Sequence, residues 1–341
     1  MDRIWSIQYL RALAALAVVV FHSMTTVQGS FDIGAAGVDI FFVISGFIMA
    51  SLTFGREVSP GLFLWRRAIR IVPVYWLATL AAAAIIAVKP AFFYKGDGSI
   101  ENTALSLLFF PHESAIGGRA PVIEQGWTLE FEVFFYALCA LALLWLPQRN
   151  RLKILCGVLV LLAAIGLLLP GLTRPWGTYS SQLLLEFVGG IALAAAWRQK
   201  LLQSATLGAA AMLAGFAAFG LMQAGVLPQI GHRVLDWGLP AFLIVAGALA
   251  FEGAGRVPRS NAGALLGDAS YSLYLTHGFV LAVIQRVGGN LPLWAYLLVS
   301  IGGSILVAIA SYQLVEKPAM AALKPLWKRP SVRPSPSPAQ G

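Results

Sequence analysis

Long apolar runs dominate the pattern of hydrophobic and polar positions along this chain. Residues 71–88, 152–169 and 291–310 are apolar all round, whereas a helix on the surface of a soluble protein is apolar on one stripe. Runs of this length match the thickness of a bilayer. Hydropathy predicts ten spanning helices, near residues 7–27, 34–54, 70–89, 127–146, 152–170, 181–197, 204–223, 235–251, 265–285 and 291–313. The predicted fold class is therefore all-α, a polytopic transmembrane helical bundle with about ten spans.

Composition and charge support a membrane protein and predict its orientation. Hydrophobic residues make up 58% of the 341 positions and charged residues only 11%, so little surface is built for water. The formal net charge of +9 would also suit a nucleic-acid partner. However, of the 24 Lys and Arg residues, 18 fall on the side that holds both termini and 6 on the other. Because cytoplasmic loops collect Lys and Arg, we expect both termini in the cytoplasm and no nucleic-acid partner.

Few segments lie outside the predicted spans. The longest, residues 90–126, is predicted to be external and contains a short apolar piece, 104–111, which is expected to be re-entrant or interfacial. Residues 324–341 are rich in Lys, Pro and Ser and are predicted to be a disordered, non-catalytic tail. Residues 1–323 then form one membrane domain. The first apolar run mimics a signal peptide, but we expect it to be retained because it carries two ionisable residues.

Those two ionisable residues share one face of the first predicted span. Arg11 and His22 are eleven residues apart, so at about 100° per residue they differ by about 20° in direction. The rise of the helix separates them by about 16 Å, roughly half the hydrocarbon thickness. Ionisable groups inside a span are costly, so we interpret this stripe as a polar seam that faces other helices or a water-filled cavity. It is the first candidate for an active site.

Two carboxylates lie at the same predicted depth as the histidine. Counting from the predicted ends of their spans places His22, Asp39 and Glu132 about 8 Å beneath the outer surface. A carboxylate beside an imidazole can hold its tautomer and raise its basicity, so these three residues form a candidate catalytic group. The alternative is a polar network that only joins helices. Tyr136 follows Glu132 at i+4 on the same face, so Glu132 is expected in the seam and Glu130 at the membrane interface.

Other polar residues in the spans have both a functional and a structural interpretation. Tyr274 and His277 share a face near mid-membrane, where a histidine often makes only a hydrogen bond between helices. Arg67 and Arg70 point the same way at the start of the third span, which suits a bidentate grip on phosphates. From charge alone, however, anchoring beside lipid headgroups explains this pair better.

The small pair Ser45 and Gly46, the loop histidines and the cysteines each have a simple interpretation. Ser45 and Gly46 would let another backbone or a thin ligand arm approach the second span closely. His112 and His232 fall in predicted outer loops and are interpreted as solvated. The two cysteines lie in apolar spans without metal-ligand spacing, so we expect core residues and no metal site.

Together these residues resemble the acyltransferase-3 family of bacterial integral-membrane acyltransferases. The resemblance covers nearly the whole chain, because six motifs occur in family order. They are YLRALAALAVVVFH, GVDIFFVISGF, RRAIRIVPVYW, GWTLEFEVFFYAL, YSLYLTH and VEKP. The form GWTLEFEVFFY is more similar to exopolysaccharide-production acetyltransferases than to O-antigen acetylases. Some larger members carry a further periplasmic esterase-like domain after the last span; here a short basic tail follows, so such a domain is expected to be absent or supplied by another protein.

The resemblance implies an O-acyltransferase of the bacterial inner membrane. Such a protein moves an acyl group, usually acetyl, from cytoplasmic acetyl-CoA to sugar hydroxyls of surface glycans or their lipid-linked precursors. Acetyl-CoA would be a co-substrate rather than a permanently bound cofactor, and other polysaccharide-biosynthesis proteins would be further partners. On this chain, the resemblance implies that Arg11 and His22 form the first-span motif and that Asp39 and Ser45 form the second. It implies a donor-side role for Arg67 and Arg70. The tryptophan-led motif supplies Glu132, and the late motif supplies Tyr274 and His277.

The predicted mechanism follows from these positions. CoA phosphates would bind Arg67 and Arg70, with help from Arg11, while Ser45, Tyr136, Tyr274 and His277 would line the pocket. His22, oriented by Asp39 or Glu132, would deprotonate the sugar hydroxyl or carry the acyl group transiently, and the base role needs fewer steps. Two alternatives come from other classes of protein. One is a transporter with an intramembrane proton or substrate pathway, although no internal repeat supports it. The other is a non-catalytic scaffold of a polysaccharide-export complex.

Overall fold

The computed structural model describes residues 3–53, 55, 57–93, 96–117, 120–287 and 291–324. Within these ranges the regular structure is helical and includes no strand, which confirms the all-α class. The predicted disordered tail lies outside the described residues except for Lys324. Some of the basic residues counted for orientation, such as Arg56 and Lys95, also lie outside them.

Nine helical segments of the described chain are long and apolar enough to cross a membrane, so this is a multi-pass membrane protein. Five are single helices: α1 (Trp5–Thr26), α3 (Pro60–Val88), α5 (Gly126–Trp145), α6 (Arg151–Leu168) and α9 (Ala205–Gln223). Four combine shorter pieces: η1 (Asp32–Ala36) with α2 (Gly37–Thr53), α7 (Trp176–Tyr179) with α8 (Leu184–Arg198), η3 (Val234–Gly238) with α10 (Leu239–Gly253), and α13 (Leu293–Ser311) with η4 (Tyr312–Glu316) and α14 (Lys317–Leu323). They coincide with nine of the ten predicted spans.

The remaining predicted span, residues 265–285, coincides with α12 (Ser270–Val287), which follows the short helix α11 (Asn261–Asp268). The 18 residues of α12 extend about 27 Å, but this helix is more polar than the other nine. Polar side chains such as Ser272 and His277 are fully buried, so they face other helices instead of lipid. The location of both termini in the cytoplasm, which depends on an even number of crossings, stays a prediction.

The segment between α3 and α5 contains two short elements, η2 (Pro90–Phe92) and α4 (Ile100–Leu107). The eight residues of α4 extend about 12 Å, which is too short to span; the helix overlaps the predicted apolar piece 104–111 only at residues 104–107. This helix packs beside α3, where the indole Nε1 of Trp76 donates a hydrogen bond to the carbonyl oxygen of Leu107 at 2.9 Å.

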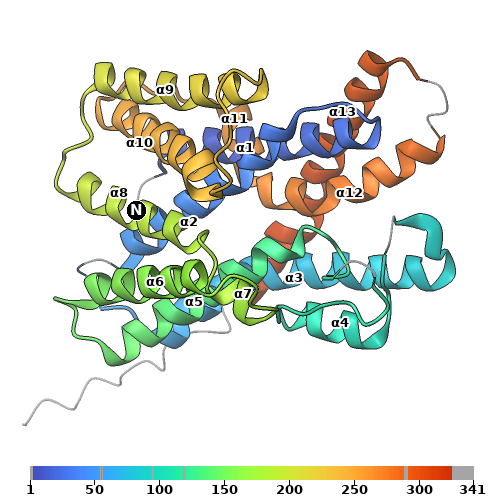
Figure 1. Cartoon of the computed structure of the whole chain (residues 1–341), viewed down its shortest axis with the longest axis horizontal. Coiled ribbons are helices and arrows are strands. Elements are labelled where there is room, and N and C mark those ends of the chain that lie inside the picture. Colours follow the sequence, from blue (N-terminus) through green and yellow to red (C-terminus); the bar gives the residue numbers. More distant parts are fainter. Residues whose placement is uncertain are drawn as a thin grey trace, which may run out of the picture.

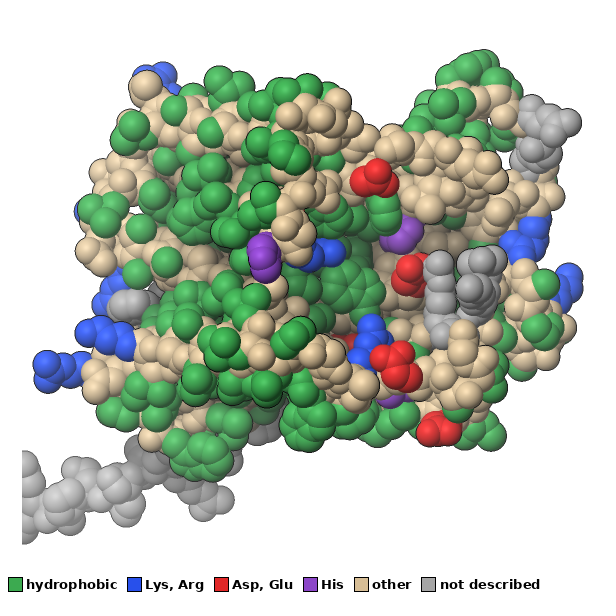
Figure 2. All heavy atoms as spheres, in the orientation of Figure 1, with side chains coloured by type: hydrophobic (Ala, Val, Ile, Leu, Met, Phe, Trp, Pro, Cys, Tyr) green, Lys and Arg blue, Asp and Glu red, His purple; other side chains and the backbone are tan. Residues whose placement is uncertain are grey.

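The span formed by η1 and α2 is the most enclosed of the nine. Helices α1, α5, α8 and α10 pack around it. Figure 1 shows α9 and α10 side by side on one flank of the bundle and α5 and α6 on another. Hydrophobic side chains cover much of the face in Figure 2, and basic, acidic and histidine side chains gather around a hollow near its middle. This distribution is what a protein with a lipid-facing surface and a polar interior requires.

Helices α2 and α8 approach each other through two glycines. A Cβ atom on Gly46 of α2 would lie 2.2 Å from the carbonyl oxygen of Phe187, and one on Gly190 of α8 would lie 2.1 Å from that of Val43. Both distances are far below van der Waals contact, and both obstacles are backbone atoms. The sequence allowed either a backbone or a ligand arm beside Gly46, and the structure shows the backbone of α8.

Gly46→Ala is expected to destabilise the protein by about 1–3 kcal/mol or more, because the added methyl group would force two helix backbones apart. Thermal unfolding of the purified protein in detergent measures the effect. Gly220→Ala on α9 is the matched control: nothing lies within 4 Å of its Cβ position, and alanine favours a helix more than glycine does. An unchanged melting temperature for Gly46→Ala would show that the two helices are not in this contact.

Candidate functional site

A cavity of about 310 Å³ opens between helices α1, α2, α3, α5 and α12. Its lining includes seven of the ten residues that the sequence predicts for the site: Arg11, Ser45, Arg67, Arg70, Glu132, Tyr136 and Tyr274. These residues come from segments up to 263 positions apart in the sequence, and the fold brings them together around one space. Apolar side chains of α2 and α3 complete the walls.

Helix periodicity positions the polar groups of the cavity. On α5, the hydroxyl of Tyr136 donates a short hydrogen bond to Oε1 of Glu132, one turn away, as the i+4 spacing predicts. The hydroxyl of Ser45 on α2 donates to the same oxygen at 3.2 Å. On α3, Arg67 and Arg70 both line the cavity, whereas Arg66 is exposed and does not.

The cavity is electrostatically positive. Its charged lining consists of three arginines and one glutamate, which gives a net charge of +2. Arg11 is only 7% exposed, and Nε of Arg67 is buried without a hydrogen-bond partner among the described residues. Buried donors without acceptors are costly, so this wall favours an anionic or strongly accepting ligand.

Glu316, the glutamate of the VEKP motif, interacts electrostatically with two of these arginines. Its carboxyl is buried and accepts a hydrogen bond from Ser272 at 2.7 Å. It interacts electrostatically with Arg11 and Arg70. Its role could not be predicted because it lies at the far end of the chain, without a recognisable partner nearby in the sequence.

His22 and His277 lie beyond this cavity and form a pair of imidazoles. Their ring centroids are 5.2 Å apart and their planes are inclined by 34°. His277 is fully buried and His22 is half-buried. The ring of Tyr274, which lines the cavity, lies 6.2 Å from that of His277. Tyr274 therefore separates the positive cavity from the imidazole pair.

The two predicted carboxylate partners of His22 have other partners in the structure. Glu132 is bonded to Ser45 and Tyr136, as described above. Asp39 is fully buried, and both of its carboxylate oxygens accept hydrogen bonds from Arg233, at 3.1 and 2.8 Å. Asp39 therefore forms a bidentate ion pair with Arg233, and its role in orienting His22 stays a prediction. Equal depth in the membrane places two groups at one level but not on facing sides of their helices.

Arg233 was counted only as an outer-loop cation, but it is a central side chain of this region. Its guanidinium lies 4.6 Å from the ring centroid of Trp237 and 5.7 Å from that of Trp127. Glu186 lies near Asp39 as a second buried acid. No local pattern predicts these contacts, because Arg233 and Asp39 are 194 positions apart.

Arg233→Met is expected to lower stability by about 3–5 kcal/mol, because it leaves the buried carboxylate of Asp39 without its partner. Thermal unfolding in detergent measures the loss. The double variant Asp39→Asn with Arg233→Met removes both charges and should recover much of it. If the double variant were as unstable as the single one, the ion pair would not be the cause.

Glu130, predicted to be interfacial, and His112, predicted to be solvated, are both buried. Glu130 is only 2% exposed, and neither carboxyl oxygen has a hydrogen-bond partner among the described residues, which corrects the prediction that it lies at the interface. It is enclosed because α5 is surrounded by protein at this level, so opposite faces of the helix are both covered. His232, in contrast, is exposed as predicted.

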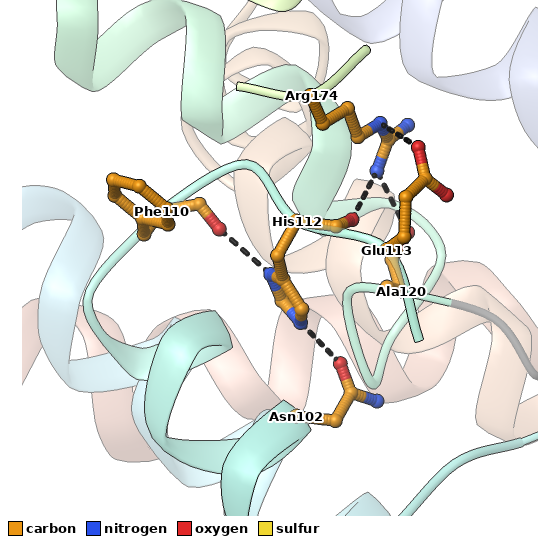
Figure 3. A network of polar contacts seen from close by, with 6 residues as sticks. All are labelled: Asn102, Phe110, His112, Glu113, Ala120 and Arg174. Carbon is orange, nitrogen blue, oxygen red and sulfur yellow. Dashed lines mark hydrogen bonds and ion pairs between the residues drawn. The ribbon is translucent and has the colours of Figure 1, made fainter. Parts of the chain in front are cut away.

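His112, which was predicted to be solvated, is instead buried in a polar network after α4 (Figure 3). Its Nδ1 lies 2.7 Å from the carbonyl oxygen of Phe110, and its Nε2 lies 2.6 Å from Oδ1 of Asn102. Arg174 approaches from another segment: it donates to the carbonyl oxygens of His112 and Ala120 at 3.2 Å. The network ties the segment after α4 to the loop before α7.

Asp97, which precedes α4, is bonded to the segment after α4. It accepts hydrogen bonds from the Ser114 hydroxyl at 2.6 Å and from the backbone N–H of Ser99 at 2.9 Å. Burial alone would raise the pKa of the Asp97 carboxyl, but these hydrogen bonds leave the pKa below its usual value.

No group of three His, Cys, Asp or Glu side chains in the described ranges could hold a metal ion.

Comparison with known proteins gives consistent matches. A family model described as an acyltransferase domain matches residues 4–313. The chain is 37% identical to the exopolysaccharide production protein ExoZ of Rhizobium meliloti, over 88% of this chain and 94% of ExoZ. It is 26% identical to the acyltransferase MdmB of Streptomyces mycarofaciens, over 99% and 96%, and 28% identical to the peptidoglycan O-acetyltransferase OatA of Listeria monocytogenes, over 56% and 34%. No solved structure matches the chain.

Proposed function

Because this chain belongs to the acyltransferase-3 family, as its motifs predicted, we propose that it transfers an acyl group, in the simplest case acetyl, from acyl-CoA to a polysaccharide hydroxyl. The observation that carries the proposal is the positive cavity, whose wall residue Tyr274 lies 6.2 Å, between ring centroids, from His277 of the imidazole pair. The acceptor is an exported polysaccharide or its lipid-linked precursor. The names of two relatives, an exopolysaccharide production protein and a peptidoglycan O-acetyltransferase, support this class of acceptor.

The donor fits the cavity in chemistry and in size. CoA carries phosphates, and Arg67, Arg70 and Arg11 offer the charge-assisted hydrogen bonds that phosphates prefer. A volume of about 310 Å³ is at the small end of ligand pockets, so it would take the acyl-pantetheine arm while the nucleotide stays at the mouth. With the termini in the cytoplasm of a bacterial cell, the arginines of α3 would meet CoA on the side where it is made.

His22 acts as the general base in this proposal. The hydroxyl oxygen of the sugar attacks the thioester carbon while His22 takes the hydroxyl proton, the C–S bond breaks, and the proton passes from His22 to the departing CoA sulfur. A half-buried imidazole, which is not sealed from a substrate, suits this exchange. Because Asp39 and Glu132 have other partners, we assign Asp39 to holding Arg233 and Glu132 to the wall of the donor cavity.

The test uses purified protein, acetyl-CoA labelled in the acetyl group, and a glycan extract. The proposal expects label in the glycan and release of free CoA in equal amounts. A transporter or a scaffold would transfer no label above the rate without protein, and that result would reject the proposal. Mass spectrometry of the surface glycans of a strain with and without the protein then identifies the acceptor by an acetyl-sized difference.

A further inference from the structure

The buried imidazole of His277 is held at both ring nitrogens. Its Nδ1 lies 3.1 Å from the carbonyl oxygen of Leu273, one turn earlier on α12. Its Nε2 lies 3.2 Å from the side-chain amide nitrogen, Nε2, of Gln125, the residue that precedes α5. Gln125 is itself buried. The ring is therefore fixed between its own helix and the start of the helix that carries Glu132 and Tyr136.

These two contacts select one protonation form of the ring. A carbonyl oxygen only accepts hydrogen bonds, so Nδ1 carries the hydrogen. The amide nitrogen of Gln125 only donates, so Nε2 is the acceptor and the ring is neutral. With the amide turned over, its oxygen would require a second proton on a ring with no exposed surface, and an isolated buried charge is costly. The arrangement therefore favours the neutral Nδ1–H tautomer.

We propose that Gln125 is a positioning residue for acyl transfer: it fixes His277 as a neutral Nδ1–H ring, which in turn supports the ring of His22. The inference rests on the proposed function, in which His22 becomes an imidazolium when it takes the hydroxyl proton. A neutral aromatic ring 5.2 Å away can face that cation favourably, whereas a second imidazolium would repel it. Gln125 excludes the second cation.

Gln125 also joins the donor cavity to the imidazole pair. Its backbone carbonyl accepts a hydrogen bond from the hydroxyl of Thr128, which lies 3.1 Å from the hydroxyl of Tyr274. The start of α5 thus contacts α12 at two positions one turn apart, Tyr274 in the cavity wall and His277 beside His22. A tie of this kind would hold both ends of the site in register.

The test is ¹⁵N NMR of the full-length protein labelled at histidine, together with kinetics. The chain has four histidines, so His277→Asn assigns the signal. In the parent we expect ¹⁵N shifts of a neutral Nδ1–H ring. In Gln125→Met, which keeps the length but removes the donor, we expect the other tautomer or an imidazolium to appear. We also expect kcat to fall about tenfold to a hundredfold, as when groups that orient an imidazole are removed elsewhere, with the KM for acetyl-CoA unchanged.

Ser270→Ala is the structural control, because it removes a buried hydrogen bond at the start of the same helix, to the carbonyl oxygen of Gly267, without touching His277. It should lower the melting temperature while the His277 signal and kcat stay near the parent's values. An imidazolium or Nε2–H ring in the parent, an unchanged kcat in Gln125→Met, or an equal loss of kcat in Ser270→Ala would each overturn the assignment. The tautomer readout needs no catalysis, so it is separate from a failure of the proposed function, in which the parent itself would transfer no label.

Discussion

Replacing His22 with alanine is expected to lower kcat for acyl transfer about a hundredfold to ten-thousandfold, the usual contribution of a positioned general base. Donor binding should stay at the parent's value, because His22 does not line the cavity that holds Arg67 and Arg70. Transfer of label from acetyl-CoA to the glycan measures the first quantity, and calorimetric titration with CoA measures the second on the same preparation.

His232→Ala is the matched control, since this histidine is exposed. It should retain the parent's rate. A His22→Ala variant that kept more than a tenth of the parent's kcat would contradict the base role. Incubation with labelled acetyl-CoA and no acceptor separates the two chemistries that the sequence left open: label that stays on the parent protein but not on His22→Ala would make His22 an acyl carrier instead of a base.

The lining of the positive cavity could be anticipated from the sequence, because its residues follow helix periodicity within recognisable motifs. The three-residue spacing of Arg67 and Arg70 and the four-residue spacing of Glu132 and Tyr136 place each pair on one face without knowledge of the fold. Which faces meet is a tertiary question. The family resemblance supplied that information by grouping the motifs into one site, and the shared cavity agrees with it.

The partner of Asp39 could not be anticipated in this way. Depth in the membrane is one coordinate of three, so counting residues from a span end places Asp39 level with His22 but does not give its direction. The direction is set by the packing of α2 against its neighbours and by the return of Arg233 from a distant loop. A buried carboxylate and an arginine preceding another span have no common pattern in a single sequence.

Burial of isolated polar residues also escaped the sequence. His112 was interpreted as solvated because it stands in a connecting segment, and Glu130 as interfacial because only one of Glu130 and Glu132 can face the polar seam. Glu130 is enclosed by the protein packed around α5, and His112 is covered because Arg174 ties the segment after α4 to the loop before α7. Such a cover depends on contacts between segments that are each irregular, so neither hydropathy nor periodicity reports it.

The site consists of two parts with different physical character. One is a positive cavity with three arginines, suited to phosphates, and the other is an imidazole pair held by Gln125 and suited to proton transfer. Tyr274 lies between them. Because the parts are separate, damage to one should change donor affinity and damage to the other should change the rate of the bound complex. The arginines provide the clearer test of this division.

The double variant Arg67→Ala with Arg70→Ala is expected to weaken CoA binding by about a hundredfold to ten-thousandfold. Each charge-assisted hydrogen bond contributes about 1.5–3 kcal/mol, and about 1.4 kcal/mol corresponds to a factor of ten. Calorimetric titration with CoA measures the affinity. Acetylpantetheine, which lacks the phosphates, provides an internal comparison: the parent and the double variant should use it as a donor at similar rates, because its arm reaches the thioester position without these arginines.

Arg66→Ala is the matched control, because Arg66 precedes Arg67 directly but is exposed and does not line the cavity. If the α3 arginines served only to anchor the helix among lipid headgroups, removing Arg66 would matter as much as removing its neighbours, and CoA affinity would not change in either variant. A parent-like affinity in the double variant would therefore favour anchoring and reject the donor site. Loss of affinity in the double variant alone, with acetylpantetheine still used, ties the phosphates of the donor to the face of α3 that the cavity exposes.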